Sequence, residues 1–207
     1  MIICGDMRQV AFPMARLALT DPPYNIGFKY DKHDDKMPAG LYMDLLSRTR
    51  DIADILAVIQ YPEECARYIY PALGVPDEVI AWCYNTNIGK AFRLVNIYGA
   101  KPDYSRVRQA YKNPTDKRIA ARIAEGHTGG KLYDWFSDIQ LVKNVSSEKT
   151  IHPCPIPERL AERIILLLTN PGDMVVDPFS GCGSVGAAAI KSGRSFFGAE
   201  VSEEYAR

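Results

Sequence analysis

The feature that most constrains the fold of this 207-residue chain is a strand–loop–helix–strand pattern near its end. Residues 174–176 predict a short buried strand, and residues 183–191 predict an alanine-rich helix. A turn at 192–193 leads to a second predicted strand at 195–199. A helix that links two strands in this way makes them parallel, and the crossover is almost always right-handed. The chain is therefore expected to form an α/β sheet with helices on both faces.

The rest of the chain continues the alternation of strands and helices. Further elements are predicted along it, the strands at 17–20, 54–60 and 79–83 and the helices at 39–50, 62–70 and 158–169. Residues 29–38 are charged and contain a proline, which indicates a loop. Residues 100–150 lack a clean period, so they are expected to leave the sheet as a small insertion. Length and pattern together predict a single domain over residues 1–207.

A glycine-rich loop lies between the strand at 174–176 and the helix after it. Gly181, Gly183 and Gly186 have the spacing G-x-G-x-x-G, which permits a tight turn and the close approach of a ligand. Glu200 ends the next strand, 19 residues after Gly181, where its carboxylate can accept hydrogen bonds from both hydroxyls of a ribose. The combination predicts a nucleoside-type cofactor. A tight turn without a ligand is the structural alternative.

Residues 177–180, Asp-Pro-Phe-Ser, lengthen the loop before its first glycine. Dinucleotide folds place that glycine almost directly after the strand, with the pyrophosphate on the helix N-terminus, so the longer loop favours a cofactor without a pyrophosphate. S-adenosylmethionine fits, because its cationic sulfonium and ammonium groups prefer a nearby carboxylate. An NAD(P)-dependent oxidoreductase is the alternative from another enzyme class. The cofactor contacts predicted here come from Asp177, Phe179, Ser180, Gly181, Gly183 and Glu200.

A second motif, Asp21-Pro22-Pro23-Tyr24, directly follows the predicted strand at 17–20. It is expected at the carboxyl end of that strand, where open α/β sheets bind ligands. The exocyclic amino group of adenine or cytosine is a poor nucleophile, because its lone pair is delocalised into the ring. The carboxylate of Asp21 and the carbonyl of Pro22 can accept its two N–H groups and free the lone pair.

The remaining residues of this motif suit the same chemistry. The prolines fix the backbone and lack an N–H, so the turn presents acceptors with little competing donor capacity. Tyr24 offers a flat face for stacking a base that has been flipped out of a duplex. A rigid Pro-Pro turn with a half-buried tyrosine is the structural alternative.

At these two motifs the sequence resembles the DNA amino-methyltransferases, which use S-adenosylmethionine to methylate adenine N6 or cytosine N4. The catalytic motif precedes the cofactor motif, an order that resembles the β class of this family. The resemblance implies a Rossmann-like, mixed and mostly parallel sheet, a target-recognition segment within about 100–150, and often a homodimer. It implies that residues 21–24 are catalytic and that Asn25, the next residue, contacts the nucleic acid. It adds cofactor contacts from Asp6, Asp21 and His152.

The resemblance also bears on the target base. Adenine N6 is favoured, because the cytosine-N4 enzymes of the family more often have serine in place of Asp21. Cytosine N4 is the alternative within the family, and an RNA amino group is a weaker one. A binding module without catalysis is the non-enzymatic alternative. The chain departs from the family at Pro155-Ile156, where the family often has Gln-Lys.

Charge is distributed unevenly, although Lys plus Arg and Asp plus Glu both number 25 and the net charge is zero. Zero net charge does not by itself indicate nucleic-acid binding. Residues 101–131 hold eight basic and three acidic residues, however, with tyrosines among them. Contacts to phosphate or base edges of double-stranded DNA are predicted from Lys112, Asn113, Lys117 and Arg118. A solvated polar surface is the alternative.

Other classes of protein are excluded by composition. No apolar run approaches the ~18 residues of a membrane span, and the N-terminus lacks a signal-peptide pattern. Five cysteines without a C-x-x-C pair argue against a disulfide framework and a structural zinc site. A cytoplasmic protein without a metal or a membrane partner is expected. A restriction endonuclease partner and a solitary host or phage enzyme are equally compatible with the sequence.

Overall fold

The computed structural model describes residues 1–27, 35–86, 89–142 and 155–206. Within them, one eight-stranded sheet has the order β1-β10-β9-β2-β3-β5-β4-β8. Its strands are β1 (Ile2–Cys4), β2 (Ala15–Thr20), β3 (Ala53–Gln60), β4 (Glu78–Cys83), β5 (Phe92–Tyr98), β8 (Trp135–Phe136), β9 (Met174–Asp177) and β10 (Ser195–Glu200). Strand β5 runs antiparallel to β3 and β4, and the other neighbouring pairs are parallel. The predicted mixed, mostly parallel sheet is confirmed.

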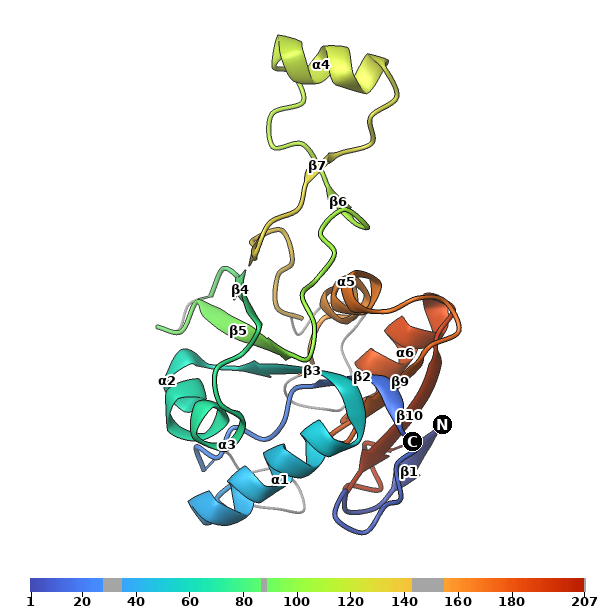
Figure 1. The fold of residues 1–207 in the computed structure, drawn as a ribbon. Coiled ribbons are helices and arrows are strands. Elements are labelled where there is room, and N and C mark those ends of the chain that lie inside the picture. The colour runs from blue at the N-terminus through green and yellow to red at the C-terminus, as the bar shows by residue number, and fades with distance from the viewer. Residues whose placement is uncertain (28–34, 87–88, 143–154, 207) are drawn as a thin grey trace.

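Helices cover both faces of the sheet, as predicted (Figure 1). One face packs against α1 (Ala39–Asp51) and a continuous helical run of α2 (Pro62–Glu64), the π-helical turn η1 (Cys65–Ile69) and α3 (Tyr70–Leu73). The other face packs against α5 (Glu158–Leu168) and α6 (Ser184–Lys191). The two cores consist mainly of aliphatic side chains with little or no exposed surface. None of the helices in the described ranges is long and apolar enough to cross a membrane.

The centre of the sheet contains a topological switch point. Strands β2 and β9 are parallel neighbours there, and Leu17 and Ala18 pair with Val175 and Val176. The chain leaves β2 through α1 on one face and leaves β9 through α6 on the other. Connections that diverge in this way leave a crevice at the carboxyl ends of the two strands, where α/β folds bind ligands.

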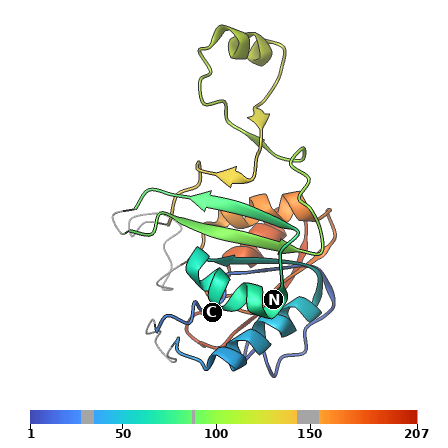
Figure 2. The ribbon, with the colours of Figure 1, turned by 60° about the vertical axis from the view of Figure 1, so that its left-hand side comes forward.

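The insertion predicted within 100–150 projects from the sheet between β5 and β8. Its stem pairs β6 (Arg108–Gln109) with β7 (Gly130–Lys131) in antiparallel fashion, and α4 (Lys117–Ala124) forms its tip. We call residues 105–134 the arm; Figures 1 and 2 both show it standing away from the sheet. Helix α4 has no buried residue, and the side chain of Asp116 caps it by accepting from the N–H groups of Arg118 and Ile119. Residues 143–154 of the predicted insertion lie outside the described residues.

Candidate active site

A cavity of about 460 Å³ lies at the switch point and brings the two motifs together. Residues 21–24, after β2, form one part of its wall, and residues 177–181, at the end of β9, form another. A volume of this size suits a small ligand. The predicted cofactor residues that line it are Asp6, Asp21, Asp177, Phe179, Ser180, Gly181 and Glu200. Gly183 lies beside the cavity rather than in its wall, and His152 lies outside the described residues.

The glycine loop fixes the carboxylate of Glu200 through the backbone. Gly181 has a φ of 49°, and its N–H donates to Oε2 of Glu200 at 2.8 Å. The N–H of Ser202 donates to Oε1, also at 2.8 Å. Each carboxylate oxygen can accept a further hydrogen bond. The side chain is therefore oriented toward the cavity with acceptor capacity left for a pair of hydroxyls.

Two other glycines allow neighbouring elements to approach closely. A Cβ at Gly186 would lie 2.6 Å from the ring of Phe196, so the third glycine of the motif permits α6 to pack on β10. A Cβ at Gly198 would lie 2.1 Å from Oγ of Ser180 in the cofactor loop. The sequence analysis did not identify Gly198, because its role depends on a contact between β10 and a loop 18 residues earlier.

Asp177 is a buried carboxylate whose hydrogen-bond partners among the described residues carry no positive charge. Its Oδ1 accepts from Oγ1 of Thr20 at 2.8 Å and from the N–H of Phe179 at 3.0 Å. Burial raises the pKa of Asp177 to about 7, and the negative charges of Asp21 and Glu200 act in the same direction. A cationic group in the cavity would offset this cost. The site therefore fits a ligand with a positive charge and a ribose.

Asp6 lies in the loop after β1 and borders the same cavity. The guanidinium of Arg8 donates to both of its carboxylate oxygens, with Nε at 3.0 Å from each. These hydrogen bonds hold the pKa of Asp6 below its usual range. The N–H of Gly5 donates to the carbonyl of Glu200 at 2.8 Å, which ties this loop to the end of β10.

The motif at residues 21–24, predicted to be catalytic, places Asp21 beside two donors. The hydroxyl of Tyr24 donates to Oδ1 of Asp21 at 2.5 Å, and Nη1 of Arg93 lies 3.7 Å from Oδ2. Burial raises the pKa of Asp21, while the charge of Arg93 and the hydrogen bond from Tyr24 oppose this. The ring of Tyr24 packs edge-on against Tyr61, with centroids 5.0 Å apart. The carboxylate is thus oriented by the residues around it.

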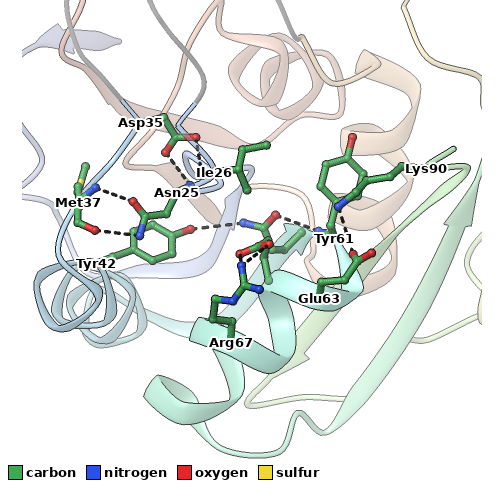
Figure 3. A network of polar contacts seen from close by, with 11 residues as sticks. Asn25, Ile26, Asp35, Met37, Tyr42, Tyr61, Glu63, Arg67 and Lys90 are labelled. Atoms are coloured by element: carbon green, nitrogen blue, oxygen red, sulfur yellow. Dashed lines mark hydrogen bonds and ion pairs between the residues drawn. The ribbon is translucent and has the colours of Figure 1, made fainter. Parts of the chain in front are cut away.

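The turn after Asp21 is closed by a network of polar contacts (Figure 3). The carbonyl of Pro23 accepts from the hydroxyl of Tyr42 at 2.5 Å. Asn25 has a φ of 56°, and its side chain both accepts from the N–H and donates to the carbonyl of Met37, at 2.6 and 3.0 Å. Its N–H donates to Oδ1 of Asp35 at 2.6 Å. Asn25 therefore closes this loop, and a contact with nucleic acid stays a prediction.

The other predicted nucleic-acid residues lie on the arm. Lys112 packs on Trp135, with Nζ 4.3 Å from the ring centroid. Asn113 accepts from the hydroxyl of Thr115 at 2.9 Å. Lys117 begins α4, and the side chain of Arg118 in the same turn is 92% exposed. The structure gathers these residues on one projecting element, apart from the wall of the cavity.

Comparison with known proteins gives a consistent set of similarities. The family model described as "DNA methylase" for N6 and N4 enzymes matches residues 57–207. The "DNA adenine methyltransferase YhdJ" of Escherichia coli (strain K12) is 30% identical over 241 residues, which cover 99% of this chain and 79% of the relative.

Two solved structures share the fold. The PvuII DNA methyltransferase, described as cytosine-N4-specific, has a TM-score of 0.68 at 17% identity and covers 99% of this chain and 83% of its own. The M1.HpyAVI–SAM complex has a TM-score of 0.63 at 22% identity, and the match covers 99% of this chain and 94% of that protein. The named target bases of the similar proteins differ.

Proposed function

Because the chain belongs to the family of N6/N4 DNA methylases, we propose that it transfers a methyl group from S-adenosylmethionine to the N6 amino group of a flipped-out adenine in DNA. The observation that carries the proposal is the position of Asp21. Its carboxylate faces the same cavity as Asp177, a buried carboxylate that accepts hydrogen bonds from neutral donors in the part of the chain that the structure describes. The same cavity therefore holds an acceptor for an amino group, Asp21, and a carboxylate that a cation would stabilise, Asp177.

The residues of the glycine loop would hold the cofactor. When bound, S-adenosylmethionine supplies a methyl group on a cationic sulfonium, and the C–S bond breaks with both electrons left on sulfur. Asp177 favours the cationic part of the ligand, since that charge offsets the cost of its own burial. Glu200, fixed by two backbone N–H groups, accepts hydrogen bonds from the ribose. Asp6 serves the adenine end of the ligand.

The residues of the catalytic motif would activate the base. Asp21 and the carbonyl of Pro22 accept the two N–H groups of the target amino group, which draws its nitrogen toward tetrahedral geometry. As the nitrogen acquires the methyl group it becomes cationic, and its proton leaves to Asp21 and then to solvent. Tyr24 contributes the ring against which the base packs. Alignment of the reacting atoms supplies much of the rate.

The arm would hold the DNA. Lys112, Lys117 and Arg118 offer positive charge for phosphate oxygens, and Asn113 offers an amide for a base edge. Flipping the adenine costs a few kcal/mol, which contacts with the phosphate backbone can offset. His152 stays a predicted cofactor contact. A homodimer, a restriction endonuclease partner and a cytoplasmic location stay predictions from the family resemblance.

Cytosine N4 is the second candidate target, and one observation favours it. The fold of this chain resembles the cytosine-N4-specific PvuII enzyme with a TM-score of 0.68. Adenine is preferred because Asp21 stands where the cytosine enzymes more often have serine. The 30% identity to an E. coli adenine methyltransferase supports the same choice. RNA remains a weaker alternative substrate.

Two substitutions test whether Asp21 acts in methyl transfer and Glu200 in cofactor binding. Asp21→Ala should lower the rate of methyl transfer by at least about 10³-fold, while the Kd for S-adenosylmethionine stays within about threefold of wild type. Glu200→Ala should instead weaken cofactor binding by about tenfold or more. Equilibrium binding and single-turnover rates measure the two effects separately.

The matched control for these substitutions is Asp54→Ala, at the amino end of β3 and so away from the cavity, where the exposed carboxylate forms an ion pair with exposed Arg16. It should change neither quantity. Near-normal turnover in Asp21→Ala would show that the assigned mechanism is wrong.

A further inference from the structure

Arg93 is a buried cation in the wall of the cavity that neither motif contains. It lies near the start of β5, beside Trp82 of β4, and its side chain is only 8% exposed. Nη1 of Arg93 lies 3.7 Å from Oδ2 of Asp21. An arginine is costly to bury, so its burial indicates that the surrounding groups stabilise its charge.

Four aromatic rings surround the guanidinium. Its Cζ lies 5.2 Å from the ring centroids of Tyr24 and Tyr61, 5.4 Å from that of Trp82 and 5.8 Å from that of Tyr84. The Cζ atom lies over each ring, within the ~6 Å range of a cation–π interaction with an electron-rich aromatic face. The rings come from three places in the sequence and hold the planar group in one position. Among the described residues, Nε of Arg93 has no hydrogen-bond partner.

The charge of Arg93 is stabilised by the same neighbours. Burial works to lower the pKa of Arg93, but the nearby Tyr24 and Asp21 raise it by more, so that the guanidinium stays charged. Asp21 gains in return, because Arg93 opposes the effect of burial on its carboxyl group. Among the described residues, three other ionisable groups interact with Asp21. They are the phenol of Tyr24 in the same motif, the buried carboxyl group of Asp177 on β9 and the phenol of Tyr42 on α1.

We propose that Arg93 is a positioning residue of the methyl-transfer site, which holds the carboxylate of Asp21 charged and oriented as the acceptor for the target amino group. This inference rests on the proposed role of Asp21. A charged carboxylate accepts an N–H about twice as strongly as a neutral acceptor. The four aromatic rings around Arg93 contribute because they keep its guanidinium at the carboxylate of Asp21 instead of in solvent.

The test compares the pH dependence of three variants in the full chain. In Arg93→Met, the acidic limb of the single-turnover rate at saturating S-adenosylmethionine should move to higher pH by about one unit or more. On the acidic side of the limb the rate should fall by about tenfold or more, since less of Asp21 is charged there. The Kd for S-adenosylmethionine should stay within about threefold of wild type. Arg93→Lys keeps the charge, so the limb should return toward its wild-type position.

Arg163→Met is the matched control. Arg163 is also a buried arginine, with 5% of its side chain exposed, bound to the carboxylate of Asp138 at 2.7 Å and packed on the ring of Phe136 at 4.8 Å. It does not line the cavity. Its loss should lower the melting temperature without moving the acidic limb, because its carboxylate partner is not at the reacting centre.

Three outcomes would overturn the proposal. One is a folded Arg93→Met protein whose acidic limb has not moved, which would assign Arg93 to packing alone. Another is an equal shift in the Arg163→Met control. The third is a wild-type rate in Arg93→Lys, which would contradict the orienting role of the planar group. If Arg93→Met does not fold, Arg93→Gln takes its place in the first comparison. Near-normal turnover in Asp21→Ala would refute the proposed function and with it this role, whereas an unmoved limb in Arg93→Met refutes the role of Arg93 alone.

Discussion

At the scale of single residues, two carboxylates at the ends of neighbouring strands have opposite surroundings. Burial raises the pKa of both Asp21 and Asp177. Asp21 has the cation of Arg93 beside it, so part of the cost of its charge is offset within the protein. Within the described part of the chain, Asp177 accepts hydrogen bonds from neutral donors of Thr20 and Phe179. These surroundings support the proposed roles, in which Asp21 accepts a neutral amino group and Asp177 faces a positively charged ligand.

The substitution Asp177→Asn tests this division through stability and binding. The pKa of Asp177 is raised to about 7 from an ordinary value of 3.8, so the stability linked to its protonated form is full below about pH 4 and is lost as the pH rises to about 7. Without cofactor, Asp177→Asn should therefore melt at least about 3 °C above wild type at pH 8, since 1 kcal/mol corresponds to about 2–4 °C in a domain of this size. The difference should vanish near pH 4.

The same variant should bind S-adenosylmethionine at least about tenfold more weakly at pH 8, because it lacks the negative charge. Thermal melts and equilibrium binding across this pH range provide both readings. A melting difference that is equal at pH 4 and pH 8 would mean that Asp177 is not a buried group with a raised pKa.

At the scale of elements, the cofactor loop depends on close packing against β10. Gly198 lies in the middle of that strand, paired with Ile2 of β1 and Asp177 of β9. A side chain there would collide with Oγ of Ser180, which donates to the carbonyl of Asp177 at 2.8 Å. The absence of a side chain on β10 thus sets the position of the loop that forms one wall of the cavity.

Gly198→Ala should therefore displace the loop and weaken S-adenosylmethionine binding by about tenfold, with a melting temperature several degrees lower, as is typical of overpacking by about 1–3 kcal/mol. Gly40→Ala in α1 is the control, since nothing lies within 4 Å of a Cβ at that position. It should stabilise the protein slightly or leave it unchanged. Wild-type cofactor affinity in Gly198→Ala would contradict the coupling between strand and loop.

Among the described elements, five of the ten strands and the helices other than α4 could be predicted from sequence, because each is a short apolar run or an amphipathic period with a clear boundary. Strand β1 is only three residues long and β5 contains two polar residues, so neither gave such a pattern. In β5, Arg93 lies beside Asp21, and Asn96 accepts from the hydroxyl of Tyr70 at 3.1 Å. These partners are distant in sequence, so no local pattern encodes them. That the two motifs lie together could be predicted, because each directly follows a strand whose carboxyl end reaches the same crevice; their catalytic and cofactor-binding roles stay predictions.

At the scale of the whole molecule, the charge that suits DNA lies apart from the cavity that suits the reaction. The net charge of the chain is zero, yet the arm and its base hold eight basic and three acidic residues over 101–131. Helix α4 at its tip has no buried residue, so the fold of the sheet does not require these side chains. We propose that the basic side chains of the arm contact the phosphate backbone of DNA.

The variant Lys117→Ala with Arg118→Ala tests this assignment. If both side chains contact phosphates, the slope of log K for DNA binding against log salt should become less steep by about two. Cofactor affinity should not change. Arg16→Ala, at the amino end of β2, is the control and should leave the slope as it is. A double variant with the wild-type slope would contradict a phosphate-contacting arm.

The central claim is that this chain methylates an exocyclic amino group of a DNA base, and one measurement tests it most directly. The wild-type protein and Asp21→Ala are incubated with methyl-labelled S-adenosylmethionine and mixed-sequence double-stranded DNA, and the labelled nucleoside is identified by mass after digestion. The account predicts N6-methyladenine with the wild type and no label with Asp21→Ala. N4-methylcytosine would keep the mechanism and change the base. Label on a ring carbon, or unlabelled DNA from a protein that binds both cofactor and DNA, would contradict the claim.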